Sequence, residues 1–314
     1  MIHTIAILIS DIHLSHVPPV ARNNEPDWYA AMERQLIWLK QLQKEHNNPP
    51  IIAAGDIFHR WNSSPELINF AIRYLPSLYA VPGQHDLPYH SLQEIKKSAY
   101  WTLVESGTII DLPLNKSYYI EIPSCALALH GFPFGVPLQP NTDGLPYIHI
   151  AVVHDYCWQS GYSYPNAPTE KTADEHIKSG SYYHVIHFGD NHKGFLKRHK
   201  HQWIFNGGTF YRRSIDEIDY RPMVGLVLID DKADSEVIVK PVPIPITEDV
   251  FTVKVQSPQQ KENIEIGEFV DYLSNLSINA LDIEEVIRQY TVVHSVPDAV
   301  TTEIFKLLEQ TRHG

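Results

Sequence analysis

The sequence predicts an α/β fold: a two-layer β-sandwich flanked by helices, with a small C-terminal α+β appendage. Two observations predict this class. In residues 1–81, short apolar stretches with strand character alternate with amphipathic stretches of helical spacing, which is typical of parallel strands with helices on their faces. In residues 118–229, strand-like stretches follow one another mostly without helices, which favours a largely antiparallel second sheet.

The elements of the first half follow a regular order. Residues 2–10 are an apolar run that predicts a buried strand, and residues 28–45 carry an apolar stripe at helical spacing. Residues 51–54 predict a second strand. Pro65 begins a second helix, because proline is tolerated in the first turn of a helix. A third strand at residues 77–81 completes a βαβαβ arrangement.

The second half contains mainly strands. They are predicted at residues 118–122, 126–130, 147–153, 183–188, 195–200, 203–205 and 223–229. One helix is expected at residues 172–178, where Thr172 can cap the first turn. Residues 132–144 are rich in Pro and Gly and predict a surface loop, as do residues 156–168, which we expect to form part of a cleft wall.

The composition changes after about residue 243. A strand is expected at residues 250–255, and helices at residues 266–273, 283–288 and 301–310. No metal-type motif falls in this region. We therefore predict two parts: a catalytic domain at residues 1–243, and a small capping or partner-binding region at residues 244–314.

Composition and charge exclude several classes of protein. A hydrophobic content of 43% suits a globular core, and no apolar run has the roughly 18 residues needed to span a bilayer. The two cysteines, Cys125 and Cys157, form neither a metal-type pair nor a disulfide framework, so a cytoplasmic location is expected. A net charge of −12 argues against a protein that coats nucleic acid unaided.

Basic residues nevertheless gather in one stretch. They are Lys193, Lys197, Arg198, His199, Lys200 and His201, and Arg212 and Arg213 follow soon after. Lysines are common at exposed sheet edges, so one interpretation is a solvated hairpin. The other is contact with a phosphate, and the sequence leaves both open.

Short polar motifs stand where buried strands should end. They are Asp11-Ile-His13, Gly55-Asp56, Gly83-Gln-His-Asp86 and Gly189-Asp-Asn-His192, and His154 follows another strand. Loops at the carboxyl ends of strands carry function in α/β sheets, so we expect these side chains to converge. Mixed carboxylate and imidazole ligation suits Mn, Fe or Zn better than Ca. Two such ions can clamp a phosphate and activate water, which predicts a phosphoesterase.

These motifs, in this order, resemble those of the calcineurin-like metallophosphoesterases. The pattern of that superfamily is DxH, GD, GNH[DE], a later His and GHxH. Within it, the chain looks most like the SbcD-type DNA repair nucleases. That likeness rests on Asp56-Ile-Phe-His59, on Asp86 and on the run of residues 205–214 followed by residues 223–229. The resemblance covers roughly residues 1–240.

The resemblance implies roles for ten side chains. The expected metal ligands are Asp11, His13 and His192 for the first ion, Asp56 for both ions, and Gln84, His154 and Asp190 for the second. His85 is expected to face the substrate phosphate as a general acid or transition-state stabiliser, oriented by Asp86, whose carboxylate raises imidazole basicity. His59 is expected to position the substrate strand. The implied cofactor is a pair of divalent ions, most simply Mn²⁺.

Two residues depart from the family pattern, and both belong to the second ion's ligands. The family has Asn where this chain has Gln84, and His where it has Asp190. A carboxylate in place of an imidazole favours a harder ion, so we predict that this site favours Mn²⁺ over Zn²⁺ or binds more weakly. Loss of the second site, with an inactive protein, is the alternative.

Three functions remain open at this point. The first is a DNA exo- or endonuclease of repair, recombination or replication, with DNA as substrate and an SbcC-type ATPase docked on the C-terminal helices. Members of that group often dimerise, so a homodimer is an option, and no membrane contact is expected. The second is a phosphodiesterase for small nucleotides, in which aromatic residues of one loop (Tyr156, Trp158, Tyr162 and Tyr164) either stack on a base or pack on the core. The third is a catalytically silent scaffold.

Overall fold

The computed structural model describes residues 2–22, 24–141, 144–159, 171–178, 182–214, 217–230, 236–247, 250–251 and 300. The chain divides into two compact units, Met1–Lys254 and Val255–Gly314. Apart from residues 250 and 251, the predicted strand at residues 250–255 and the three predicted C-terminal helices lie outside the described residues. The boundary at residue 243 therefore stays a prediction.

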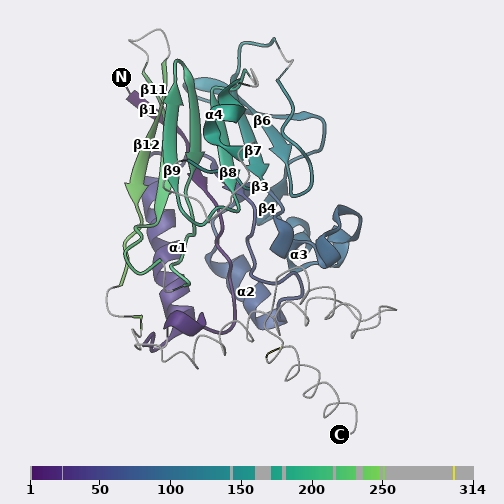
Figure 1. The fold of residues 1–314 in the computed structure, drawn as a ribbon, viewed down its shortest axis with the longest axis vertical. Coiled ribbons are helices and arrows are strands. Elements are labelled where there is room, and N and C mark those ends of the chain that lie inside the picture. The colour runs from purple at the N-terminus through teal and green to yellow at the C-terminus, as the bar shows by residue number, and fades with distance from the viewer. Residues whose placement is uncertain are drawn as a thin grey trace, which may run out of the picture. The chain divides into compact units, whose positions relative to one another are not determined.

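Two six-stranded sheets form the first unit, which confirms the predicted two-sheet α/β architecture (Figure 1). The first sheet has the order β12-β11-β1-β2-β3-β4 and the second β5-β6-β7-β8-β10-β9. The strands are β1 (Ile2–Ile9), β2 (Ile51–Ala54), β3 (Leu78–Val81), β4 (Ile109–Asp111), β5 (Ser117–Ile122), β6 (Cys125–Phe132), β7 (Ile148–His154), β8 (Val185–Gly189), β9 (Phe195–His199), β10 (Gln202–Asn206), β11 (Met223–Asp230) and β12 (Glu236–Pro243).

Three apolar cores hold the layers together. One lies between the sheets and includes Leu8 of β1 and Val152 of β7. A second lies between the first sheet and its helices, where Ile7 and Ile9 of β1 are buried. Successive side chains of a strand point to opposite faces, so an uninterrupted apolar run such as β1 is buried on both. The third core covers the outer face of the second sheet beneath α4 (Ala173–Lys178) (Figure 1).

The helices begin where their capping residues predict. In α1 (Trp28–Glu45), the Asp27 side chain accepts a hydrogen bond from the Ala30 amide, and in α2 (Pro65–Tyr74) Ser64 caps the helix before Pro65. The apolar stripe of α1 is buried against the first sheet, so this face covers the sheet and is not left free as a dimer surface. The short helix α3 (Ala99–Glu105), together with β4 and β12, was not predicted.

The prediction of a largely antiparallel second sheet was wrong. The pairs β6–β7, β7–β8 and β8–β10 are parallel, and among the described strands of this sheet only β5–β6 and β9–β10 are antiparallel. Parallel neighbours need a long connection, and the segments that follow β6 and β7 are long, the second of them with the short helix α4. Strand character alone does not fix strand direction. In the first sheet, β1, β2 and β3 are parallel as predicted, β4 adds a further parallel strand, and β11 and β12 are antiparallel additions.

This topology brings the ends of five strands to one edge of the sandwich. The Asp11 amide donates to the Gly55 carbonyl at 3.1 Å, which ties the end of β1 to the end of β2. The two sheets meet there as well, because the Asp190 amide donates to the Asp11 carboxylate at 3.1 Å. No helix among the described residues is long and apolar enough to cross a membrane.

Candidate metal centre

Left-handed backbone conformations turn the predicted ligands toward one point. Asp11, His13, Asp56 and Asp190 have φ angles of 50°, 49°, 53° and 78°. Non-glycine residues rarely adopt positive φ, and such strain persists only where the surroundings fix it. Here each strained residue stands just beyond a buried strand and carries a side chain of the centre. Four of the predicted ligands therefore have a strained backbone.

Glycines allow the strand ends to approach closely. A Cβ added to Gly189 would lie 2.0 Å from the Ala54 carbonyl oxygen, and one added to Gly83 would lie 2.0 Å from the Asp56 carboxylate. Both distances are far below van der Waals contact. These positions exclude any larger residue unless the ligand-bearing backbone moves.

Gly189→Ala is therefore expected to lower the free energy of unfolding by about 1–3 kcal/mol or more and to weaken metal binding. The measurement is chemical denaturation of the metal-free protein, followed by calorimetric titration with Mn²⁺. Gly144→Ala is the matched control, because nothing lies within 4 Å of a Cβ built at Gly144. Equal destabilisation by the two substitutions would contradict the packing argument.

The first ligand group joins the end of β1 to the end of β8. One ligand atom each from Asp11, His13 and His192 lies within 4.8 Å of the others. The Nε2 atoms of His13 and His192 are 3.2 Å apart, and His13 Nε2 is 3.9 Å from Asp11 Oδ1. These spacings suit ligands that share one ion.

Asp56 lies between this group and a second one. Its Oδ2 atom is 3.5 Å from His13 Nε2 and 3.6 Å from His154 Nε2, and Asp11, Asp56 and His154 form another group within 4.8 Å. Asp56 is fully buried, yet Oδ2 accepts no hydrogen bond from the described residues. A buried carboxylate oxygen without a partner is costly, so its position between two imidazoles fits a carboxylate that bridges two cations.

The second group is completed by Gln84 and Asp190. Gln84 Oε1 lies 2.6 Å from His154 Nε2, and Gln84 Nε2 donates to Asp190 Oδ1 at 2.6 Å. His154 Nδ1 lies 2.6 Å from the Ala54 carbonyl, which leaves Nε2 as the ligand atom. The extra methylene of Gln84 is accommodated because Asp190 supplies an acceptor for its amide NH₂. The seven predicted ligands therefore converge, including the two that depart from the family pattern.

Burial and charge shift the pKa values of the ligands strongly. Burial raises the pKa of Asp11 and of Asp56 to about 6. For His154, burial favours the neutral ring, but the surrounding carboxylates outweigh it and raise the pKa to about 9. The pKa of His192 also rises to about 9, against burial, through a hydrogen bond and neighbouring carboxylates. In the metal-free protein these two imidazoles therefore hold protons at neutral pH.

Metal binding is expected to release protons and to strengthen as the pH rises. An imidazole must be neutral to bind an ion, so at pH 7 each ion that binds His154 or His192 displaces a proton. Because both pKa values are about 9, the apparent affinity should increase from pH 6 up to about pH 9. Titration calorimetry in two buffers of different ionisation enthalpy counts the protons. A binding enthalpy at pH 7 that does not depend on the buffer would contradict this prediction.

Two further charged residues support the centre: Glu217, which sequence reasoning missed, and Arg213, which it named only among the basic residues considered for phosphate contact. Glu217 Oε1 lies 3.4 Å from His192 Nδ1, and Glu217 Oε2 accepts hydrogen bonds from the Arg213 and Ser214 amides. Arg213 Nη1 donates to the His13 carbonyl at 2.9 Å. Burial lowers the pKa of Arg213 to about 10, so the guanidinium stays charged beside the centre. Glu217 follows residues 205–214, which carry part of the family resemblance, but Glu217 itself belongs to no motif.

Glu217→Gln is expected to weaken binding at the first metal site by about 10- to 100-fold, the usual loss when a carboxylate behind a histidine ligand is replaced. The substitution keeps the size of the side chain but removes the charge that faces His192 Nδ1. Calorimetric titration with Mn²⁺ measures the change. Glu236→Gln, at an ion pair with Arg198, is the control and should leave the affinity unchanged.

The proposed substrate-facing histidines lie beside the first ligand group. The His59 and His85 rings stack with centroids 5.3 Å apart and planes 20° apart, and both meet the His13 ring edge-on. His85 Nδ1 lies 2.9 Å from the His59 carbonyl, which orients the ring. Burial lowers the pKa of His85, although the Asp86 carboxylate acts in the opposite direction. Burial therefore outweighs the increase in the His85 pKa that was expected from Asp86.

Asp86 acts mainly on the backbone. Its carboxylate accepts hydrogen bonds from three main-chain amides, those of Ile57, Phe58 and Gly83. Two of these amides follow Asp56 directly, so Asp86 fixes the turn that carries the bridging ligand. It is the main-chain carbonyl of His59, and not the carboxylate of Asp86, that lies next to His85 Nδ1.

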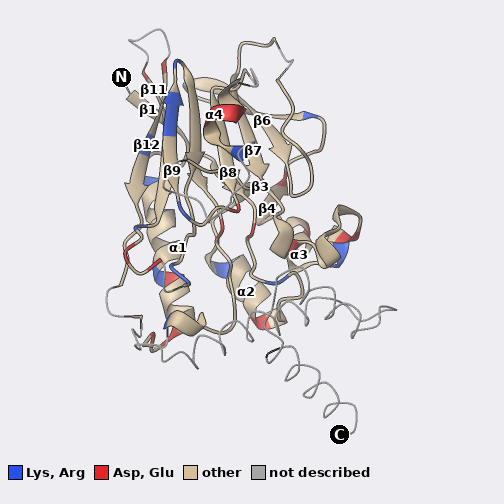
Figure 2. Cartoon of the chain, in the orientation of Figure 1, with Lys and Arg blue, Asp and Glu red and all other residues tan. Residues whose placement is uncertain are grey.

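The basic stretch lies on β9, an edge strand of the second sheet. Lys197 Nζ pairs with Asp174 at 2.5 Å, and Arg198 pairs with Glu236 and lies over the Trp203 ring. Figure 2 shows acidic positions on α4, and both basic and acidic positions elsewhere on the molecule. These contacts support the solvated hairpin edge over phosphate contact.

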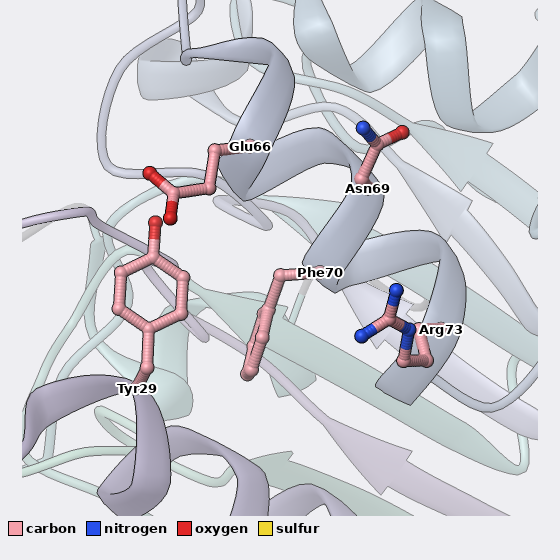
Figure 3. A pocket seen from close by; sticks show the side chains of 5 residues that line it. All are labelled: Tyr29, Glu66, Asn69, Phe70 and Arg73. Carbon is pink, nitrogen blue, oxygen red and sulfur yellow. The ribbon is translucent and has the colours of Figure 1, made fainter.

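A surface pocket of about 420 Å³ lies between α1 and α2. Figure 3 shows the Tyr29 hydroxyl directed toward Glu66, with the Phe70 ring beside them; Asn69 and Arg73 complete the lining. None of these residues belongs to the metal-ligand groups. The pocket is separate from the chemistry predicted from the motifs.

A model of calcineurin-like phosphoesterases matches residues 6–210, a span that contains every ligand described above. The chain belongs to the calcineurin-like phosphoesterase family. The resemblance predicted from the motifs is thereby confirmed at the level of the superfamily. Membership agrees with the dinuclear site that the ligand groups indicate. No curated protein sequence matches the chain.

Several solved structures are similar to this phosphoesterase at low sequence identity. A putative 5'-nucleotidase from Staphylococcus aureus, crystallised with alpha-ketoglutarate, has 14% identity and a TM-score of 0.52; the match covers 85% of this chain but only 58% of the nucleotidase. A calcineurin-like phosphoesterase from Bacillus subtilis has 10% identity over 85% of this chain and 98% of its own, with a TM-score of 0.47. NAD nucleotidase from Haemophilus influenzae has 12% identity over 100% of this chain and 68% of its own, with a TM-score of 0.44.

The aromatic loop expected to close a narrow pocket is only partly described. Trp158 pairs with Thr172 through an isolated bridge, and its amide donates to the Lys171 carbonyl. Tyr162 and Tyr164 lie outside the described residues. Both alternatives for this loop, stacking on a base and packing on the core, stay predictions.

Proposed function

We propose that this phosphoesterase hydrolyses phosphodiesters with two divalent ions, and that DNA is its substrate. The observation that carries the proposal is the position of Asp56 Oδ2, buried without a hydrogen-bond partner among the described residues and about equally far from His13 Nε2 and His154 Nε2. A single ion does not need a carboxylate shared between two ligand groups. Two ions bound there would supply Lewis-acid stabilisation of a phosphate and an activated water.

The chain's own residues then orient the phosphate and move a proton. A carbonyl oxygen only accepts, so the contact of His85 Nδ1 with the His59 carbonyl places the proton on Nδ1. Nε2 is left as the nitrogen that takes up and releases a proton, which suits donation to the leaving oxygen. The buried cation of Arg213 and the stacked ring of His59 lie at the same end of the centre, where a phosphate carries its charge.

DNA is favoured as substrate by the sequence around the bridging ligand. His59 follows Asp56 in the segment that resembles the SbcD-type nucleases, and its ring packs on His85, where it can contact a substrate strand. A net charge of −12 suits an enzyme that leaves part of its DNA binding to another protein. We therefore include an SbcC-type ATPase as partner, bound through residues 244–314, and Mn²⁺ as the working ion.

Small nucleotide esters are the second candidate substrate. The same net charge favours them, because a small substrate needs no extended basic surface. The basic residues on β9 are paired with carboxylates, which removes one route for DNA contact. The two candidates share the metal centre and differ only in what surrounds it.

The experiment is cleavage of end-labelled linear DNA with Mn²⁺, compared with hydrolysis of bis-p-nitrophenyl phosphate in the same preparation. An Asp56→Asn variant purified alongside identifies contaminating activity. We expect the wild type to degrade DNA and the variant to be inactive. Hydrolysis of the small ester without DNA cleavage, even when the ATPase is added, would favour the second candidate. Failure on both substrates with two bound ions would contradict the proposal.

A further inference from the structure

We propose that four aromatic side chains beside the metal centre form a stacking platform for the nucleobase next to the scissile phosphate. They are Trp61, Tyr89, His90 and Phe134, here called the aromatic rim. The inference rests on the proposed function, because it assigns a nucleotide substrate to the same site. It names a binding subsite that the metal ligands alone do not define.

The rim is assembled from three loops that surround the centre. Trp61 follows the bridging Asp56 and His59 on the loop after β2. Tyr89 and His90 follow the Gly83–Asp86 turn after β3. Phe134 follows β6, and its amide donates to the Pro82 carbonyl at 3.2 Å, directly before that turn. The rim residues are thus held next to the loops that carry His59 and His85.

The rings are arranged in two pairs. Trp61 and Tyr89 have centroids 5.7 Å apart with planes at 55°, and His90 and Phe134 have centroids 5.8 Å apart with planes at 56°. Burial and the nearby His85 imidazole both lower the pKa of His90, which links the second pair to the catalytic histidine. The rim therefore consists of two ring pairs, and three of its four residues (Trp61, Tyr89 and His90) lie on the loops that also carry His59 and His85.

Core packing does not account for these rings. None of the four belongs to the three apolar cores of the described residues. Tyr89 is 47% exposed, so much of its surface is open to solvent. Aromatic surface that remains open to solvent beside a site is available to a ligand.

The backbone that carries Tyr89 is strained. Tyr89 has φ 56° and ψ 27°, and His90 follows with φ 55°. Two consecutive bulky residues in the left-handed region are held by short turns, in which the His90 amide donates to the Leu87 carbonyl and the Ser91 amide to the Pro88 carbonyl. Such strain gathers at ligand sites, where the surroundings fix it. Here it holds the Tyr89 ring outward, beside Trp61.

A nucleobase is the ligand that this surface fits best. Every base has a π-face that stacks on aromatic side chains, and this contact requires no basic groove. A protein with a net charge of −12 can therefore hold a nucleotide by one base while the metal centre holds its phosphate. Stacking also tolerates any base, so the rim selects nucleotides over simple phosphate esters without selecting a sequence.

The test is the affinity of the Mn²⁺-loaded protein for two ligands that resist hydrolysis, measured by calorimetry. One is a phosphorothioate-linked thymidine dinucleotide, and the other is its abasic analogue. We expect the wild type to bind the dinucleotide more tightly. Trp61→Ala and Tyr89→Ala should each reduce that preference by at least about 5-fold, the usual loss per stacked base. Tyr89→Gly, which relieves the positive φ, should give the same loss and so excludes misfolding as its cause.

Tyr119→Ala is the matched control, because Tyr119 is 46% exposed and lies on β5, an edge strand of the second sheet. It should leave the preference unchanged. Equal affinity for the two ligands, no binding of either, or variants that keep the preference would each overturn the platform. Hydrolysis of methyl p-nitrophenyl phosphate, which has no base, is measured in parallel. Its absence would count against the proposed function and not against the platform.

Discussion

Replacing Asp56 with asparagine is expected to lower kcat/KM for bis-p-nitrophenyl phosphate by about 10³-fold or more, since metal stabilisation of a phosphate contributes several kcal/mol. Asn keeps the shape and the Oδ1 acceptor for the His85 amide, but it replaces the unpaired Oδ2 that faces both imidazoles. Metal analysis of the purified variant should show fewer than two ions per chain. Activity and metal content are measured on the same sample.

The fold should survive this substitution. Burial raises the pKa of Asp56 to about 6, so the metal-free protein already disfavours the ionised form, and a neutral side chain removes that cost. Asp111→Asn is the matched control. Burial raises the pKa of Asp111 to about 6 as well, but this carboxylate accepts a hydrogen bond from Tyr100 at 2.7 Å and belongs to none of the ligand groups. An Asp56→Asn protein that keeps both ions and full activity would refute the bridging role.

The second large effect is expected at Asp190. Asp190→His should raise the affinity of the second site for Zn²⁺ relative to Mn²⁺ by about 10-fold or more, because imidazole suits zinc and carboxylate suits manganese. The same change removes the acceptor that holds the Gln84 NH₂ group at 2.6 Å. The Gln84 amide is then free to turn away from His154, so total metal content should also fall. Competition calorimetry with the two ions measures the ratio.

A histidine placed elsewhere controls for added zinc binding. Asp174, on α4, pairs with Lys197 and lies outside the ligand groups, so Asp174→His should leave the ratio at the second site unchanged. A Zn²⁺ to Mn²⁺ ratio that stays constant in Asp190→His, or that shifts toward Mn²⁺, would show that Asp190 does not determine the choice of ion. Retention of both ions with unchanged affinity would show that Asp190 is not a ligand.

Much of the centre could be predicted because the chain marks its ligands clearly. Buried strands such as β1 and β2 are continuous apolar runs. A carboxylate or imidazole directly after such a run is therefore expected at the edge of the sheet where the strand ends. Gly55, Gly83 and Gly189 stand at those ends, and all three leave no room for a Cβ beside the ligands. The order of motifs then matched one known family.

Other features depend on contacts between distant segments and leave no local signal. The direction of each strand in the second sheet depends on the path of the long connection that precedes it. The apolar pattern of a strand does not encode that path. Glu217 reaches His192 from a separate loop, and the hydrogen bond between Gln84 and Asp190 joins residues 106 positions apart. The left-handed backbone at Tyr89 is equally hidden, since tyrosine does not favour it.

The central claim is that Asp56 joins two metal sites. Anomalous diffraction from crystals grown with Mn²⁺ tests it most directly. The account predicts two ions about 3.5–4 Å apart, one on each side of the Asp56 carboxylate, with His13 and His192 on one and His154 and Asp190 on the other. A single ion, or two ions that do not share Asp56, would contradict it.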